Sequence, residues 1–161
     1  MTRFPDLQAL VEIIGPRFAE GAAERDRDDA FVAGHYDVLK QHKVFSALVP
    51  AELGGGGVHH SAMCAFLRRL AHYCPSTALA LSMHQHLVAA AVYHHGNGRP
   101  GRPLLKRVAA DETVLVSTGA NDWMESNGAM ERVFGGFRVR ARKPFGSGSP
   151  KGDLLVTSAA F

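Results

Sequence analysis

Residues 75–96, PSTALALSMHQHLVAAAVYHHG, constrain the fold more than any other stretch of the chain. Pro75 suits the first position of a helix, and Gly96 suits its C-terminal end. The stretch between them is apolar on nearly every side, and such a helix is stable only when other elements cover it. The sequence therefore predicts a buried central helix with four core side chains: Leu79, Leu81, Leu87 and Val88.

Four further amphipathic segments predict helices that surround this one. They span residues 5–24, 28–45, 61–73 and 102–112. Apolar residues recur in them at spacings of three and four, which places those side chains on one face of each helix. In the first segment this face consists of Leu7, Leu10, Val11, Ile14 and Phe18. We expect residues 5–110 to form a helical bundle around the central helix.

The pattern changes from helical to extended near residue 113. The runs TVLVST and DLLVTS predict strands, and the Gly135–Gly136 pair between two extended halves predicts a hairpin. Phe137 and Val139 alternate with arginines, which predicts a half-buried strand with one face in water. Helices followed by strands indicate an α+β fold: an N-terminal all-α helical bundle, then antiparallel β-strands of an incomplete β-barrel domain with an open sheet edge.

Composition excludes several classes of protein. The 161 residues are enough for one ordinary domain with a buried core. The sequence has no run of about 18 apolar residues, so we expect no membrane span, and its N-terminus does not resemble a secretory signal. Cys64 and Cys74 lie in apolar helical stretches and are expected to be buried and reduced. We therefore expect a cytoplasmic protein.

The net charge of +3 is distributed unevenly along the chain. Up to His60 there are six basic and nine acidic residues, whereas from Ser61 onward there are twelve and six. The lysines and arginines of the second part are scattered singly and form no basic patch, which argues against nucleic-acid binding. A basic second part is better suited to an anionic small ligand, such as a nucleotide cofactor.

The four consecutive glycines of residues 54–57 raise the question of a phosphate site. A phosphate-binding loop follows a strand and usually ends in Lys-Ser or Lys-Thr. Here the run continues as Val-His-His and contains no lysine. We therefore interpret it as a tight connection between the second and third helices.

The histidines do not predict a metal site. Paired ligands on one helix need a spacing of three or four residues, so that both side chains point the same way. His84 and His86 are two apart, and His86 and His94 are separated by about two turns. No carboxylate accompanies them, so we expect no bound metal.

Four segments occur in a distinctive order and spacing. They are LVPAELGGGGV, STALALSMHQHLVAAAVYHHG, LLKRVAADETVLVSTGAND and GGFRVRARKPFGSGSPKGDLLVTSA. In this order they resemble the N-terminal part of the acyl-CoA dehydrogenase superfamily, and the resemblance covers nearly the whole chain. It implies an N-terminal helical domain at residues 1–112 and the first part of the middle β-domain at residues 113–161, with the C-terminal helical domain absent.

The resemblance implies a flavin site built from the ends of two strands. STGANDWMESNG matches the family segment that meets the flavin ring, and it offers hydroxyl groups and the backbone N–H groups of Gly119 and Ala120. RKPFGSGS matches the second segment, where Phe145 replaces the usual Trp and Ser147 the usual Thr. Such donors stabilise the electron density that a flavin gains on reduction. The implied FAD-binding residues are Ser117, Thr118, Gly119, Phe145, Gly146 and Ser147.

The substrate side of this site is implied more weakly. Ser126 and Trp123 follow the first strand and are the expected substrate-binding residues. Trp123 forms either a wall of the substrate cavity or an anchor of its own loop.

The implied activity is α,β-dehydrogenation of an acyl-CoA-like substrate, by hydride transfer to FAD, in a full-length protein that forms a homo-oligomer. The family's catalytic carboxylate comes from the C-terminal helical part. We therefore expect the base beyond residue 161 and no activity from this chain alone. The family's Glu-Pro is missing after the first strand, and RKPFGSGS also resembles flavin-dependent monooxygenases of the same fold. A monooxygenase, or a non-catalytic helical interaction module, stays open as an alternative.

Overall fold

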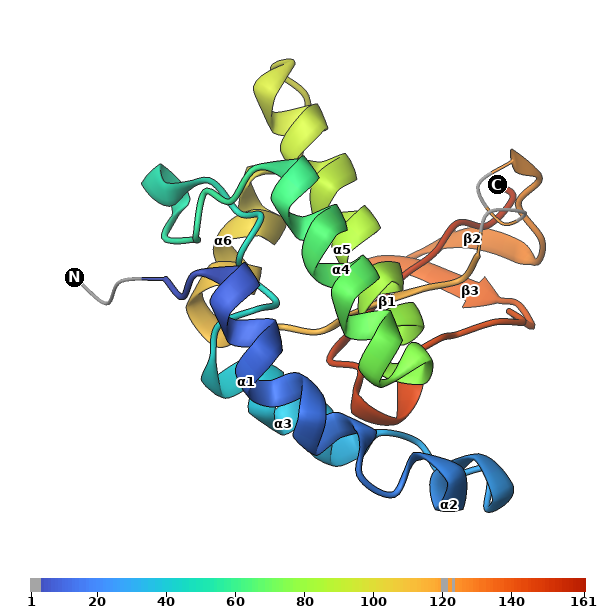
Figure 1. Cartoon of the computed structure of the whole chain (residues 1–161). Helices are drawn as coiled ribbons and strands as arrows, with labels where there is room; N and C mark the ends of the chain where they lie inside the picture. The colour runs from blue at the N-terminus through green and yellow to red at the C-terminus, as the bar shows by residue number, and fades with distance from the viewer. Residues whose placement is uncertain (1–3, 120–121, 123) are drawn as a thin grey trace.

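The computed structural model of the chain describes residues 4–119, 122 and 124–161. Helices form one side of the molecule and strands the other (Figure 1). In chain order the helices are α1 (Leu7–Ala19), α2 (Ala22–Arg27), α3 (Ala33–Gln41), the 3-10 turn η1 (Ala51–Leu53), α4 (His60–Tyr73), α5 (Pro75–Gly96) and α6 (Arg102–Asp111). The later elements are β1 (Leu115–Ser117), β2 (Ala129–Val133), β3 (Gly136–Arg140), the 3-10 turn η2 (Ser149–Lys151) and β4 (Leu154–Val156). This order confirms the α+β class.

The long helix α5 forms the centre of the helical part, as the sequence predicts. It packs against α4, α6 and β1, and α1 packs on the outer side of α4. Leu81, Leu87 and Val88 are buried. The expected burial of Leu79 is wrong, because its side chain is 63% exposed. Leu79 lies on the same face of α5 as Tyr93, which is 64% exposed, so this face points away from the core.

Two of the expected helices are shorter than their apolar pattern. The first ends at Ala19, because Gly21 adopts a left-handed φ of 67° and starts the separate short helix α2. The second covers only Ala33–Gln41, and Lys43, with a φ of 56°, turns the chain sharply. Val44 and Phe45 are fully buried in this turn rather than in a helix.

The glycine run forms the tight connection that the sequence predicts. Gly54 has a φ of 93°, which ends η1 in a left-handed conformation. A Cβ on Gly55 would lie 2.2 Å from the carbonyl oxygen of Val49, and one on Gly56 would lie 2.7 Å from that of Ala47. The glycines are therefore needed because two backbone segments pass in direct contact.

The strands form two separate pairs. β2 and β3 make the expected antiparallel hairpin, with Gly135 and Gly136 at its turn and φ angles of 81° and 159°. β1, however, pairs with β4 in parallel, with Leu115 opposite Leu154. The expectation of antiparallel strands is wrong for this pair. Parallel neighbours require a long crossover connection, and here the hairpin and its flanking segments supply it.

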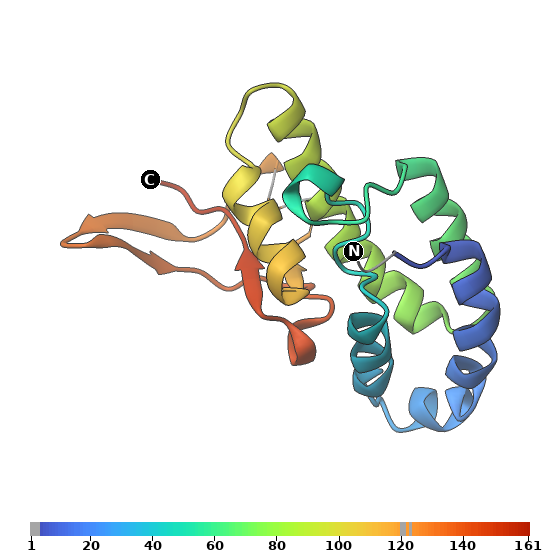
Figure 2. The same ribbon diagram turned by 90° about the vertical axis from the view of Figure 1, so that its left-hand side faces the viewer.

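The hairpin projects away from the helices (Figure 2). Every residue of β3 is exposed, so the expected half-buried strand with Phe137 and Val139 inside is not observed. Among the described residues, the aromatic neighbour of Phe137 is Phe161, with the ring centroids 6.2 Å apart. The alternating pattern correctly predicts a strand, but it does not predict whether another element covers the apolar face of that strand.

Burial differs between the two cysteines. Cys74, at the junction of α4 and α5, is buried as expected, whereas Cys64 is exposed on α4, so its expected burial is wrong. Both are free thiols. Among the described residues, none of the helices combines the length and the apolar character that a membrane span requires.

A set of buried hydrogen bonds joins the turn at residues 43–46 to α5 and β1. The N–H of Leu115 donates to Nδ1 of His84 at 2.9 Å, so Nε2 carries the proton and donates to the Phe45 carbonyl at 2.9 Å. Gln85 donates from Nε2 to the carbonyl of Val44 at 2.8 Å. Buried backbone groups require such partners, because they have lost their contact with water.

Glu112, directly after α6, completes this set. Its carboxylate accepts hydrogen bonds from the N–H groups of Phe45 (3.0 Å) and Ser46 (3.3 Å) and from the Ser46 hydroxyl. Burial raises the pKa of Glu112, whereas burial lowers the pKa of His84 from 6.5 to about 4. The turn is therefore held by one carboxyl group and one neutral imidazole from different elements.

Replacing Leu87 by Ala tests the central position of α5. We expect the free energy of unfolding to fall by about 2–5 kcal/mol, because a buried cavity is left behind. Leu79→Ala is the matched control on the same helix, with an expected change below about 0.5 kcal/mol. Chemical unfolding measures both values. Equal losses in the two variants would contradict this packing.

The pH dependence of stability tests the role of His84. Its pKa is about 4 in the folded chain, against 6.5 for an ordinary histidine. The unfolded chain therefore binds the proton first, so this contribution is complete above pH 6.5 and is lost as the pH falls to 4. His84→Gln keeps a neutral donor and removes the titration. We expect the stability advantage of the wild type over this variant to shrink by ~3 kcal/mol between pH 7 and 4.

Urea unfolding over this pH range gives the comparison. His35, whose pKa is also lowered to about 4 by burial, is present in both proteins, so its contribution cancels in the difference. A difference that stays constant with pH would mean that His84 is not held as a neutral imidazole.

Candidate functional site

The end of β1 and the loop that follows β3 lie side by side. A Cβ placed on Gly119 would be 3.9 Å from the Cβ of Phe145, and one on Gly146 would be 3.8 Å from Cγ1 of Val116. The six residues expected to bind the flavin therefore fall on two adjoining segments, 117–119 and 145–147. We call these the strand-end segments.

The hydroxyl groups of the first strand-end segment are oriented by neighbours. Ser117 and Thr118 are both buried. Ser117 Oγ accepts a hydrogen bond from the N–H of Gly119 at 3.3 Å and lies 3.4 Å from Nε2 of His86 on α5. Thr118 Oγ1 donates to the carboxylate of Asp122 at 2.5 Å. Fixed side chains at a strand end suit the binding of a rigid ring.

His86 also belongs to this site, although its spacing in the sequence raises only the question of a metal ligand. Its imidazole is partly exposed, and burial lowers its pKa. A neutral imidazole beside Ser117 is able to hydrogen-bond without adding charge. His84, two residues earlier, points into the core instead, so the two histidines have different roles.

Phe145, in the second strand-end segment, is an exposed aromatic residue with an unusual backbone conformation. Its side chain is 80% exposed, and its backbone has a φ of 61°, which bulky residues rarely adopt. The N–H of Ser147 donates to the Phe145 carbonyl at 2.8 Å and closes the turn. Such conformations persist where surrounding structure imposes them and cluster at binding sites. The turn therefore presents an aromatic ring and a partly exposed serine beside bare glycine backbone.

Asp122 and Lys143 form a buried ion pair next to the strand-end segments, and no motif in the sequence predicts it. Lys143 also donates to the carbonyls of Asn127 (2.8 Å) and Ser158 (2.6 Å). The hydrogen bond from Lys143 and that from Thr118 keep the pKa of Asp122 well below its usual range. Only the sequence positions of these residues indicate that they belong to the site: Lys143 precedes Phe145 by two residues, and Asp122 follows Thr118 by four.

The role of the expected substrate-binding residues, Ser126 and Trp123, stays a prediction. Ser126 is exposed, and its hydroxyl donates to Ser158 Oγ at 2.7 Å. Trp123 and Ala120 lie outside the described residues. Among the residues that the structure describes, no group of three or more His, Cys, Asp or Glu side chains is arranged to hold a metal ion.

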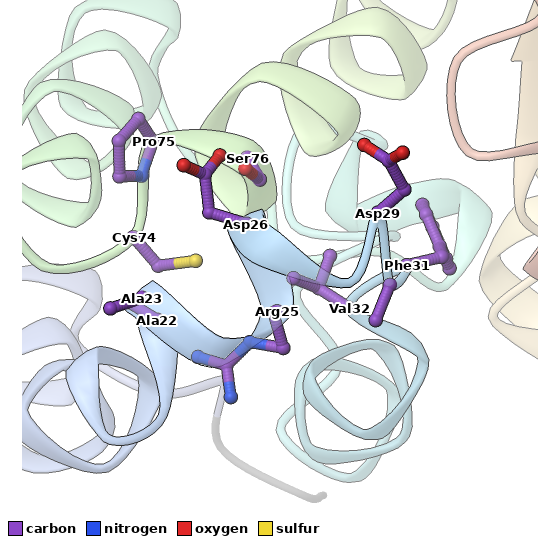
Figure 3. Close-up of a pocket in the computed structure, with 11 residues that line it drawn as sticks. Ala22, Ala23, Arg25, Asp26, Asp29, Phe31, Val32, Cys74, Pro75 and Ser76 are labelled. Atoms are coloured by element: carbon purple, nitrogen blue, oxygen red, sulfur yellow. The ribbon is translucent and has the colours of Figure 1, made fainter.

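A cavity of about 590 Å³ is lined by residues other than those of the strand-end segments (Figure 3). It opens between α2, the start of α3 and the start of α5. Asp26, Asp29, Phe31, Cys74 and Ser76 are among the residues that line it. None of the residues implied by the family resemblance contributes to it, so the cavity and the strand-end segments are two distinct places in the molecule.

Comparison with known proteins gives several relatives. The amino sugar nitrososynthase RubN8 of Streptomyces rubradiris is 32% identical, over 89% of this chain and 36% of that protein. The structure of KijD3 with FMN and dTDP-3-amino-2,3,6-trideoxy-4-keto-3-methyl-D-glucose is 30% identical, with a TM-score of 0.80, over 96% of this chain and 40% of that one. XiaF from Streptomyces sp., with FADH2 and glycerol, is 26% identical, with a TM-score of 0.70, over 92% and 36%.

The chain spans about two fifths of the length of these relatives or less. The family profile described as "Acyl-CoA dehydrogenase, N-terminal domain" matches residues 8–112, which is most of the helical part. With this match and the shared fold, the chain belongs to the acyl-CoA dehydrogenase N-terminal domain family.

Proposed function

We propose that the chain is the N-terminal part of a flavin-dependent oxidoreductase whose flavin ring lies against the two strand-end segments. The observation that carries the proposal is their close approach, with exposed Phe145 in a strained turn on one side and the hydroxyls of Ser117 and Thr118 on the other. The flavins in the similar structures of KijD3 and XiaF support it.

The residues present fit a flavin ring chemically. Phe145 offers an aromatic face for packing, and bare backbone at Gly119 and Gly146 allows a flat ring to approach closely. The partly exposed hydroxyl of Ser147 provides a donor for a reduced flavin, whereas the Thr118 hydroxyl is already donated to Asp122 and orients the end of β1. These groups would contact the isoalloxazine ring, which FMN and FAD share. Both FMN and FAD are therefore candidate cofactors.

Oxygenation is the reaction we favour. A bound reduced flavin supplies two electrons, so that one atom of O2 enters the substrate and the other leaves, with two protons, as water. RubN8 is named as an amino sugar nitrososynthase, and KijD3 is seen with a dTDP-linked amino sugar, so we propose a nucleotide-linked amino sugar as the substrate. The basic second part of the chain suits such an anion.

Dehydrogenation of an acyl-CoA-like substrate is the second candidate. The family profile over residues 8–112 favours it. Two features argue against it: the family's Glu-Pro is missing after β1, and the relatives named above act on or bind other small molecules.

We also propose that residues 1–112 form the helical domain and residues 113–161 the first part of the β-domain.

Replacing Phe145 by Ala tests the flavin site. We expect the Kd of the purified protein for FMN or FAD to rise about 10-fold, because an aromatic packing contact is lost. Phe134→Ala is the matched control, since Phe134 is a fully exposed aromatic at the tip of the hairpin. Quenching of flavin fluorescence measures both affinities. An unchanged Kd in Phe145→Ala, or an equal loss in both variants, would contradict the proposed position of the ring.

A further inference from the structure

The Asp122–Lys143 pair is unusual for an ion pair because it is almost completely buried. The side chains are 3% and 9% exposed. The other ion pairs between described residues, such as Arg138–Glu131 on the hairpin, have side chains that are at least one third exposed. A buried pair is retained only where its geometry is good and its remaining polar groups are satisfied.

The remaining polar groups of this pair are satisfied. The three donors of Lys143 Nζ are used by the Asp122 carboxylate and by the carbonyls of Asn127 and Ser158. On the other side, Asp122 Oδ2 accepts from Thr118 Oγ1, from Thr157 Oγ1 (3.1 Å) and from the N–H of Ser158 (3.2 Å). A fully satisfied buried network holds its members in one arrangement.

The network joins the segments that follow three strands. Thr118 and Asp122 follow β1, Lys143 follows β3, and Thr157 and Ser158 follow β4. Among the described residues, backbone pairing between the two strand pairs consists of one bridge, between Ala129 and Ala160, and side-chain contacts add Ser126–Ser158 and Phe137–Phe161. The pair is therefore well placed to set the relative position of the two sheets.

We infer that Asp122 and Lys143 are positioning residues that set the spacing between the strand-end segments. Asp122 fixes the Thr118 hydroxyl, and with it the end of β1. Lys143 fixes the start of the turn that carries Phe145. Neither residue needs to touch the flavin, because each acts through its neighbours. The identity of the ligand rests on the proposed function. The claim that the pair sets the spacing of the strand-end segments does not depend on it.

Asp122→Asn and Lys143→Met test this inference, each of them removing one charge. Glu131→Gln is the matched control, because it breaks the exposed ion pair with Arg138 on the same part of the chain. The first measurement is amide hydrogen exchange without flavin. We expect exchange in both strand-end segments to be about 10-fold faster in either variant and unchanged in the control. The peptides of α1 and α4 provide an internal reference for global unfolding.

The second measurement is flavin affinity. In the single variants we expect the Kd for FMN to rise about 10-fold, and in the double variant we expect no further rise, because two residues that act as one unit are not additive. Thr157→Val removes one hydrogen bond to Asp122 and keeps the pair. It provides a milder variant, with a smaller increase in exchange at the same segments, in case the charge variants do not fold.

The outcomes separate the two proposals. Unchanged exchange at residues 117–119 and 145–147 in the folded variants would overturn the positioning inference, even if the wild type binds FMN. Wild-type protein that binds neither FMN nor FAD would overturn the proposed function, and the exchange measurement would still decide whether the pair sets the spacing. Additive losses in the double variant would also contradict the inference.

Discussion

The imidazole of His84 connects the three parts of the chain on which the candidate site depends. It belongs to α5, accepts a hydrogen bond from the first residue of β1, and donates one to the buried turn at residues 43–46. Because both ring nitrogens are used, the position of β1 against the helical core is fixed at its start. The end of this short strand, with Ser117 and Thr118, is thereby fixed as well.

Local sequence patterns predicted the helical part well. The limits of α5 were predictable from Pro75 and Gly96, since proline and glycine act through the local backbone. The exposure of Leu79, the exposure of Cys64 and the parallel pairing of β1 with β4 were not predictable in this way. Each depends on which distant element covers a face or lies beside a strand, and hydrophobic periodicity does not contain that information.

The candidate site was predicted from a family resemblance rather than from the residues alone. Single serines and phenylalanines near strand ends are common. Only the order of the four family-like segments indicates that these ones bind a flavin. The partners that fix them were missed for a physical reason. Asp122 and Lys143 are 21 residues apart in sequence and meet only after the hairpin has folded back. The role of His86 is not predictable from its sequence position, because spacing on one helix gives no information about a contact with a strand.

We propose that a flavin binds at the strand-end segments and not in the cavity beside α2. Amide chemical shifts in a nitrogen–proton NMR spectrum, recorded during titration with FMN, test it most directly. We expect the largest shifts at residues 117–119 and 145–147, with little change at residues 22–32, 74 and 76. Shifts confined to the second set would contradict it and would locate the ligand in the cavity.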